Sequence, residues 1–222
     1  MYMSLFSFGK ELRDMRIKLG LTQNDVSTLT GINTDTLRRI EGGKVMPKFE
    51  TLSYLSAIYK HDLNTLFLKY RFNDFDSLYE LKNKLESKFD RDEFYTLNTE
   101  LKELNSLIRN IHNSYFKDYL TQLTLLTDAV ILYKDEDKYK EAIERLIKAI
   151  IITLPTFDLD NYKSLVYSPM EMRILMNIAF VLNKMNNDSM YLEILEFCIK
   201  SVDEVNEMYP KLCYNLAGAY TR

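Results

Sequence analysis

The chain has 222 residues, 46% of them hydrophobic, which is enough for a core larger than that of one small domain. Residues 1–72 carry 11 Lys and Arg against 7 Asp and Glu, a balance of +4, so the remaining residues hold −7 of the total charge of −3. A basic head before an acidic body indicates that only the head approaches nucleic acid. No apolar run reaches the ~18 residues of a membrane span, and the start lacks a signal peptide's apolar stretch and cleavage site. We therefore expect a cytoplasmic protein that has no contact with a membrane.

Two short helices joined by a tight turn are predicted between Leu21 and Pro47. Thr22 can accept the backbone N–H groups that open the first helix, and Asp25, three residues later, completes a weak reciprocal cap. Gly31 supplies the left-handed turn, and Asn33 caps the second helix. Apolar residues at helical spacing are expected to bury one side of each helix against the other: Val26, Leu29, Ile32, Leu37 and Ile40.

The opposite side of the second helix is predicted to be exposed and polar. It carries Thr34, Asp35, Arg38 and Arg39. These side chains can form hydrogen bonds with base edges and phosphates in a major groove. The pair of helices therefore predicts a DNA-binding head.

The sequence around these helices resembles the lambda-repressor-like, or XRE, helix-turn-helix family from about Phe8 to Tyr70. The segment GKELRDMRIKLGLTQ matches the family's first helix, and PKFETLSYLSAIYKHDLNTLF matches its fourth and fifth. The resemblance implies that Gln23 binds a phosphate and braces the recognition helix. It also implies a structural ion pair between Arg16 and Glu41, which ties the first helix to the end of the third.

The same resemblance places Thr34, Asp35 and Arg39 where the family reads bases. Arg39 can form a two-pronged bond to guanine O6 and N7. Asp35 could accept from cytosine N4, but a carboxylate there repels phosphates and is favoured in the first turn by the helix dipole alone. Arg38, and Lys44 in the loop after the helix, either contact phosphates or are simply solvated. The predicted DNA-binding residues are Gln23, Asn33, Thr34, Asp35, Arg38, Arg39 and Lys44.

Past residue 72 the apolar residues recur every three or four positions, which predicts an all-helical body. The helices are expected near Phe75–Ser87, Arg91–Asn110, Ser114–Tyr133, Lys138–Leu154, Pro169–Lys184, Ser189–Val205 and Tyr209–Tyr220. Cys198 and Cys213 lie in apolar helical patterns and are expected to be buried thiols without a disulfide. The cysteines, His61 and His112 show no metal-ligand spacing, and no catalytic constellation stands out. We expect no metal, no cofactor and no enzymatic activity.

An internal repeat lies near the end of the chain. MNIAFVL (Met176–Leu182) and YNLAGAY (Tyr214–Tyr220) share an Asn, an aliphatic residue and an Ala, 38 residues apart. YNLAGAY resembles the first-helix signature of the tetratricopeptide repeat, and the segment Lys138–Pro155 resembles its second helix. One nearly complete repeat spans about Leu123–Thr156, so the body is expected to be a stack of helical hairpins.

The predicted fold is all-α, with a five-helix lambda-repressor-like DNA-binding domain at residues 1–72 and a right-handed tetratricopeptide-like solenoid at residues 73–222. This architecture resembles the peptide-pheromone-responsive Rgg, Rap, NprR, PlcR and PrgX (RRNPP) regulators of Gram-positive bacteria. The resemblance implies a homodimer that binds a double-stranded DNA operator and is controlled by a short signalling peptide, as in quorum sensing. Two alternatives stay open: a constitutive phage-type or plasmid-type repressor whose body only dimerises, and a protein-interaction scaffold.

The peptide-binding residues that the resemblance implies are Asp128, Asn177 and Asn215, which share one position of the repeat. A carboxamide donates and accepts hydrogen bonds at once, so an Asn in the concave groove of the helical body can bond both polar groups of a peptide unit. Alternatively, these side chains bond neighbouring helices and only fix the stack.

Overall fold

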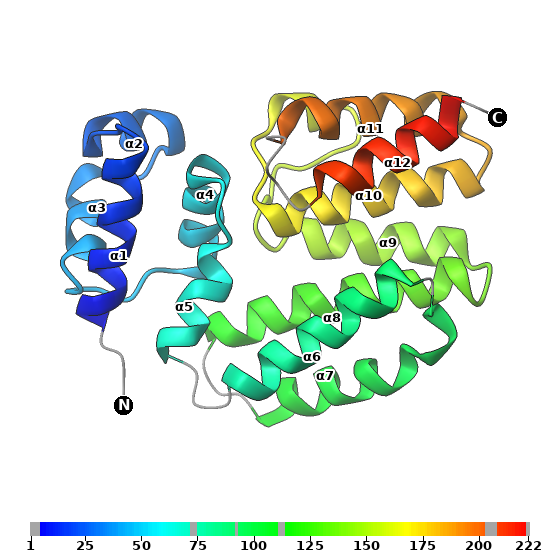
Figure 1. Ribbon diagram of the computed structural model, residues 1–222, viewed down its shortest axis with the longest axis horizontal. Coiled ribbons are helices and arrows are strands. Elements are labelled where there is room, and N and C mark those ends of the chain that lie inside the picture. Colours follow the sequence, from blue (N-terminus) through cyan, green and yellow to red (C-terminus); the bar gives the residue numbers. More distant parts are fainter. Residues whose placement is uncertain (1–4, 72–74, 92, 111–113, 203–207, 221–222) are drawn as a thin grey trace. The chain divides into compact units, whose positions relative to one another are not determined.

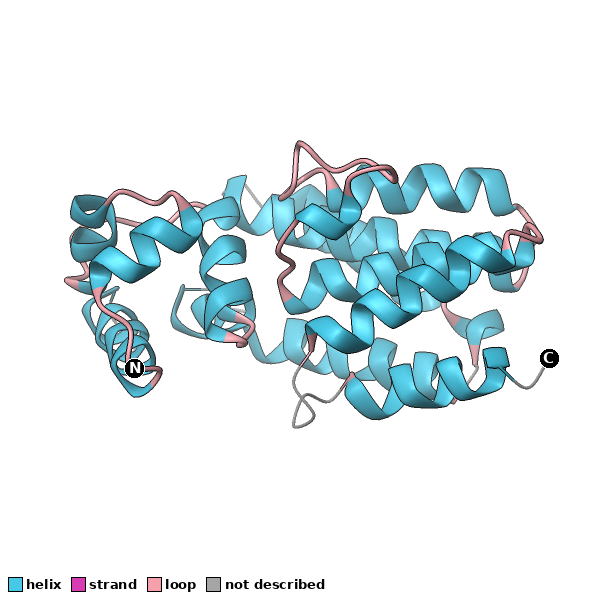
Figure 2. Ribbon diagram, turned by 90° about the horizontal axis from the view of Figure 1, so that it is seen from above, coloured by secondary structure: helices cyan, strands magenta, loops and turns pink. Residues whose placement is uncertain are grey.

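The computed structural model describes residues 5–71, 75–91, 93–110, 114–202 and 208–220 (Figure 1). These residues form helices and loops without any strand, as Figure 2 shows, and the all-α prediction is confirmed. None of the described helices is long and apolar enough to cross a membrane. The chain divides into two compact units: unit 1 contains Met1–Glu86, Ile111–Tyr119 and Val166–Pro169, and unit 2 contains Ser87–Asn110, Leu120–Leu165 and Met170–Arg222.

Unit 1 starts with the helices of the head: α1 (Leu5–Lys18), α2 (Gln23–Thr30), α3 (Thr34–Glu41), α4 (Phe49–Tyr59) and α5 (Leu63–Arg71). The predicted caps of α2 and α3 are confirmed. The Thr22 hydroxyl accepts from the backbone N–H of Asp25 at 3.1 Å, and the Asp25 carboxylate accepts from the backbone N–H of Thr22 at 2.7 Å. Gly31 ends α2 with φ of 72°, and Asn33 Oδ1 accepts from the N–H of Asp35 at 2.8 Å. Local chemistry therefore sets both ends of the turn between these helices.

The core of the head draws apolar residues from all of these helices: Phe8, Leu12, Val26, Leu37, Ile40, Leu52, Leu55, Leu63 and Phe67. Gly9 lets α1 approach α3 closely, because a Cβ there would lie 2.5 Å from two backbone carbonyl oxygens of α3. The expectation that Leu29 is buried is wrong, since 55% of it is exposed. Val26 is fully buried and Thr30, one turn later, is half-buried, so Leu29 falls at the edge of the buried face of α2.

A polar cluster in unit 1 joins α5 to two later helices, α6 (Phe75–Asp90) and α8 (Ser114–Lys134). Lys82 Nζ lies 3.1 Å from both Asp62 Oδ2 and Thr65 Oγ1, and Thr65 Oγ1 lies 3.2 Å from the hydroxyl of the fully buried Tyr119. Burial alone would raise the pKa of Asp62. The charge of Lys82 and the hydrogen bonds from Thr65 lower that pKa by more than burial raises it, so the net shift is downward. Burial lowers the pKa of Lys82, but its neighbours Tyr119 and Asp62 raise that pKa more, so the net shift is upward.

The other helices of the body are α7 (Asn98–Asn110), α9 (Tyr139–Ile150), α10 (Pro169–Lys184), α11 (Asp188–Ser201) and α12 (Tyr209–Tyr220). Two predicted boundaries are wrong by several residues. The helix expected from Arg91 begins at Asn98, because the preceding residues form a 3₁₀ turn in which the Thr96 hydroxyl bonds a nearby backbone carbonyl. The helix before Pro155 ends at Ile150, and a turn follows up to Leu154, the residue that Pro155 disfavours in the helical conformation.

The end of α11 also differs from the prediction. The helix stops at Ser201, and Val202 is extended with φ of −113° and ψ of 145°. The predicted continuation to Val205 falls in residues 203–207, outside the described residues.

Small residues allow the helices of unit 2 to pack closely. Ala129, Ala142, Ala149 and Ala179 have no exposed surface. Gln122 on α8 donates to the carbonyl of Ala149 at 3.0 Å and to the hydroxyl of Thr153 at 3.1 Å, which ties α8 to α9. Both cysteines are free thiols. Cys198 is buried as expected, and burial raises the pKa of its thiol to about 12, whereas Cys213 is only half-buried.

Candidate nucleic-acid interface and candidate ligand pocket

A buried ion pair holds the recognition helix α3 in place. Arg16 on α1 donates from Nε to Glu41 Oε1 at 2.6 Å and from Nη2 to Glu41 Oε2 at 3.0 Å. Arg16 also donates to the carbonyl of Leu21 at 2.8 Å, and Gln23 Nε2 donates to Glu41 Oε2 at 2.8 Å. Arg16 and Glu41 are only 8% and 6% exposed, and the bond to Glu41 raises the pKa of Arg16. One buried carboxylate therefore joins α1, the start of α2 and the end of α3.

The outward side of α3 is polar and cationic. Asp35, Arg38 and Arg39 are exposed, and Thr34 is half-buried. Arg38 donates to the Asp35 carboxylate one turn away, so part of each charge is neutralised within the helix. The guanidinium of Arg39 has no ion-pair partner in the part of the chain that the structure describes, and Lys44 is exposed in the following loop. Arg39 is thus the α3 cation that is most available for a base or a phosphate.

An open hollow of about 740 Å³ lies beside this face, between α1 and the start of α2. Its lining includes Arg13, Arg16 and Arg38, and its described lining residues include no acid. Thr22 and Gln23 place the N-terminal end of α2 at the same hollow. Free N–H groups and the helix dipole at such an end favour an anion, and arginine binds phosphate oxygens through paired donors. This surface can therefore receive a phosphate group.

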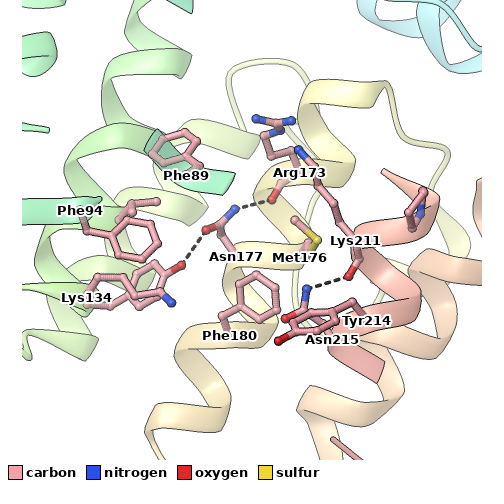
Figure 3. Close-up of a pocket in the computed structure, with 13 residues that line it drawn as sticks. Phe89, Phe94, Lys134, Arg173, Met176, Asn177, Phe180, Lys211, Tyr214 and Asn215 are labelled. Atoms are coloured by element: carbon pink, nitrogen blue, oxygen red, sulfur yellow. Dashed lines mark hydrogen bonds between the residues drawn. The ribbon is translucent and has the colours of Figure 1, made fainter. Parts of the chain in front are cut away.

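A second pocket, of about 540 Å³, lies within unit 2 (Figure 3). It is lined by Phe89, Phe94, Val130, Tyr133, Lys134, Arg173, Met176, Asn177, Phe180, Pro210, Lys211, Tyr214 and Asn215. Aromatic and aliphatic side chains form most of its wall, and three cations and two carboxamides supply most of its polar groups. The ammonium of Lys134 lies 4.6 Å from the centre of the Phe94 ring. Such a mixture of apolar wall and few polar groups is typical of a ligand site.

The two carboxamides of this pocket differ in what they bond. Asn177 Oδ1 accepts from the Tyr133 hydroxyl at 2.9 Å, and its Nδ2 donates to the carbonyl of Arg173 at 2.8 Å (Figure 3). Asn215 Nδ2 donates to the carbonyl of Lys211 at 2.7 Å, and its Oδ1 has no hydrogen-bond partner among the described residues. Asn177 therefore ties α8 to α10, while Asn215 retains an acceptor for a ligand.

Residues 7–65 match the helix-turn-helix domain family. This part of the chain is a helix-turn-helix domain. The crystal structure of Bacillus thuringiensis PlcR in complex with the peptide PapR7 and DNA is similar to the chain, with a TM-score of 0.51 at 19% identity, over 97% of this chain and 73% of PlcR. The predicted fold, a helix-turn-helix head on a helical body, is thus confirmed.

A second solved structure covers the chain with less similarity. The apo form of the competence regulator ComR from Streptococcus vestibularis aligns over 97% of this chain and 98% of its own at 16% identity. Its TM-score of 0.28 is too low for this likeness to bear on the fold. No curated protein matches the chain.

The helix-turn-helix domain gathers most of the predicted DNA-binding residues on α3 and its flanks, and two more of them, besides Asp35 and Arg38, already have partners within the domain. The carboxamide oxygen of Asn33 serves the cap of α3, and the amide nitrogen of Gln23 bonds Glu41. Arg13 was missed by the sequence analysis. It is exposed on α1 three residues before Arg16, and that helical spacing could have identified it.

The pocket brings together only two of the three predicted peptide-binding residues. Asp128 is not among its lining residues, and its Oδ2 instead accepts from Arg145 Nε on α9 at 2.8 Å. The sequence analysis missed the cations Arg173 and Lys211, although each stands four residues before a predicted Asn. The described residues contain no group of three or more His, Cys, Asp or Glu that could hold a metal ion.

Proposed function

We propose that the chain is a dimeric, sequence-specific transcription regulator. Its helix-turn-helix domain binds operator DNA, and its helical body, residues 73–222, holds the dimer and binds a short signalling peptide. The observation that carries the proposal is the exposed guanidinium of Arg39 on a helix whose position is braced by a buried ion pair. A rigid polar helix of this kind can enter a major groove with little loss of conformational freedom.

The residues of the helix-turn-helix domain would divide their work between bases and backbone. Arg39 and Thr34 would face base edges, and the hollow that holds Arg13 and the start of α2 would receive a phosphate. The bond between Asp35 and Arg38 supports a structural role for Asp35, because its carboxylate already has a cationic partner. Lys44 would add a backbone contact after α3.

Two heads are needed for useful affinity. The balance of residues 1–72 is only +4, so one head neutralises few phosphates. A dimer would place two recognition helices in successive major grooves, about 34 Å apart along the duplex. The body would then set the binding strength through the spacing of the heads.

Control by a peptide is supported by two observations. PlcR, which shares the fold, was solved with a peptide as well as DNA. The pocket of unit 2 offers an apolar wall and a carboxamide with an available acceptor. A peptide that binds one arrangement of the dimer better than another would shift the population of dimers toward that arrangement. The size of the shift is set by the difference between the peptide's affinities for the two arrangements.

Selection of duplexes from a random pool by the full chain tests the proposal. We expect an enriched palindromic site whose half-sites are about 10 base pairs apart. Arg39→Ala should weaken binding to that site by about 1–3 kcal/mol and leave binding to random DNA nearly unchanged. Lys69→Ala, which removes an exposed cation of α5, is the matched control and should keep the wild-type preference for the selected site over random DNA.

The two alternative functions predict other outcomes. A protein-interaction scaffold would enrich no sequence and show no salt-dependent DNA binding. A constitutive repressor would bind its operator in the same way whether or not peptides are present, so no peptide would saturate the body or shift the DNA-binding curve.

A further inference from the structure

Two side chains of opposite charge bond each other on the outward side of the recognition helix α3. Arg38 Nη2 donates to Asp35 Oδ1, three residues earlier on the same face of the helix. Both side chains are largely exposed, 71% for Arg38 and 55% for Asp35. An exposed ion pair of this spacing contributes little to stability, because water and salt screen it. The stability of α3 therefore depends little on this pair.

The bond brings the charged end of Arg38 to the first turn of α3. The backbone at Asp35 is fixed by the helix cap, since Asn33 Oδ1 accepts from the N–H of Asp35 at 2.8 Å. Long side chains on a helix lie back over the turn that precedes their own Cα, and the Asp35 carboxylate holds the Arg38 guanidinium there. The first residues of a recognition helix are the ones that contact base edges. The pair therefore adds a guanidinium to the part of α3 that is suited to reading bases.

Arg38 also has access to a place that suits a phosphate. It lines the hollow between α1 and the start of α2, together with Arg13 and Gln23. An arginine that binds a phosphate there holds the protein on DNA but carries no information about sequence. Arg38 can thus serve either as a backbone contact or as a base contact.

The charge of the pair favours the base contact. Asp35 and Arg38 together carry no net charge, so the pair is attracted to phosphates less than a lone arginine would be. The edge of a guanine presents two uncharged acceptors, O6 and N7, which the carboxylate does not repel as it repels a phosphate. Bonded to Asp35, Arg38 is therefore better matched to a guanine than to a phosphate.

We propose that Asp35 is a positioning residue that directs Arg38 to a guanine of the operator. The Asp35 oxygen uses one N–H of the guanidinium and leaves neighbouring N–H groups for O6 and N7. Arg38 then reads a base pair of its own, in addition to the one that Arg39 reads. The inference rests on the proposed binding of operator DNA and adds a second specificity-determining arginine to α3.

The base preferences of full-chain variants test this inference. The wild type, Arg38→Ala and Asp35→Ala each select duplexes from the same random pool, and sequencing gives the preference at every position of the site. We expect Arg38→Ala to lower the preference for guanine at one position from at least about tenfold to nearly onefold. Asp35→Ala should lower the preference at that same position by at least about threefold. Arg39→Ala should affect a different position.

Three further variants separate positioning from charge and helix stability. Asp14→Ala removes an exposed acid of α1, so it is the matched control for the loss of one negative charge and should change no position. Asp35→Glu keeps a carboxylate three residues before Arg38 and should retain the preference. In Asp35→Ala/Arg38→Ala the preference should be no lower than in Arg38→Ala alone, because Asp35 acts through Arg38. A role of Asp35 limited to the helix dipole would change the melting temperature but not the preference for one base.

The outcomes distinguish this inference from the DNA-binding proposal on which it rests. Loss of the same guanine in Arg38→Ala and Asp35→Ala supports the inference. It is overturned if Asp35→Ala keeps a guanine that Arg38→Ala loses, or if neither variant changes any position. It is also overturned if Arg38→Ala weakens binding to all duplexes equally and lowers the salt slope by about 1, as loss of a phosphate contact would. In each of these cases the wild type still selects a site, so the DNA-binding proposal stands. A wild type that selects no site overturns both.

Discussion

Replacing Glu41 by Leu should destabilise the helix-turn-helix domain strongly. The change leaves the guanidinium of Arg16, only 8% exposed, without the carboxylate oxygens that it meets at 2.6 and 3.0 Å. Removal of one partner of a buried ion pair costs about 3–5 kcal/mol. Gln23 also loses its acceptor, but its half-buried amide can turn toward water, so this loss adds little. We therefore expect the free energy of unfolding to fall by about 3–5 kcal/mol.

A double substitution separates the charge from the packing. Arg16→Met alone should cost about as much as Glu41→Leu, because it strands the carboxylate instead. Arg16→Met/Glu41→Leu should cost less than either single change, since an apolar pair of similar volume removes both buried charges. Hydrogen exchange of the α1 and α3 amides in increasing urea measures these changes within the helix-turn-helix domain. A loss below about 1 kcal/mol for Glu41→Leu, as in an exposed pair, would refute the reasoning, and so would additive losses in the double variant.

Two further predictions concern packing and pH. Gly9→Ala should lower stability by about 1–3 kcal/mol, because its Cβ would meet backbone oxygens at 2.5 Å, whereas Gly218→Ala, with nothing within 4 Å, should be neutral or stabilising in thermal melts. Equal melting temperatures for the two variants would contradict this account. The lowered pKa of Asp62 means that its stabilisation is present above the usual aspartate pKa, ~3.9, and is lost as the pH falls through its lower folded value. The raised pKa of Lys82 means that its contribution is present below ~10.4 and is lost at higher pH. Urea midpoints from pH 2 to 7 should therefore fall toward acid in the wild type and change less in Lys82→Met, and parallel curves would count against the ion pair.

Features set by neighbouring residues could be predicted from the sequence. The Thr22 cap, the left-handed Gly31 and the Asn33 cap depend on hydrogen bonds and backbone angles within a few residues. The all-helical body follows from apolar spacing in the same way. For these elements the local preferences agree with the final fold, so little information from distant parts of the chain is needed.

Features that depend on contacts between distant residues could not be predicted. Gly9 is required only because α3 passes close to it, more than thirty residues later in the chain. Asp128 occupies the repeat position that we predicted to bind a ligand, but Arg145 on α9 lies within reach and forms an ion pair with it. The role of Asn177 as a tie between helices depends likewise on Tyr133 from another helix. A single sequence does not reveal which of several possible partners a polar side chain meets.

The difference between the two cysteines offers a practical probe of the pocket. The thiol of Cys198 has no exposed surface and a pKa raised to about 12, so a maleimide reagent should not modify it in the folded chain. Cys213 is half-buried on α12, between Lys211 and Tyr214, two residues that line the pocket. The natural chain can therefore be given a single fluorophore or spin label at α12 without any substitution. Changes in the label's signal during a titration would report ligand binding at the helix that carries Asn215.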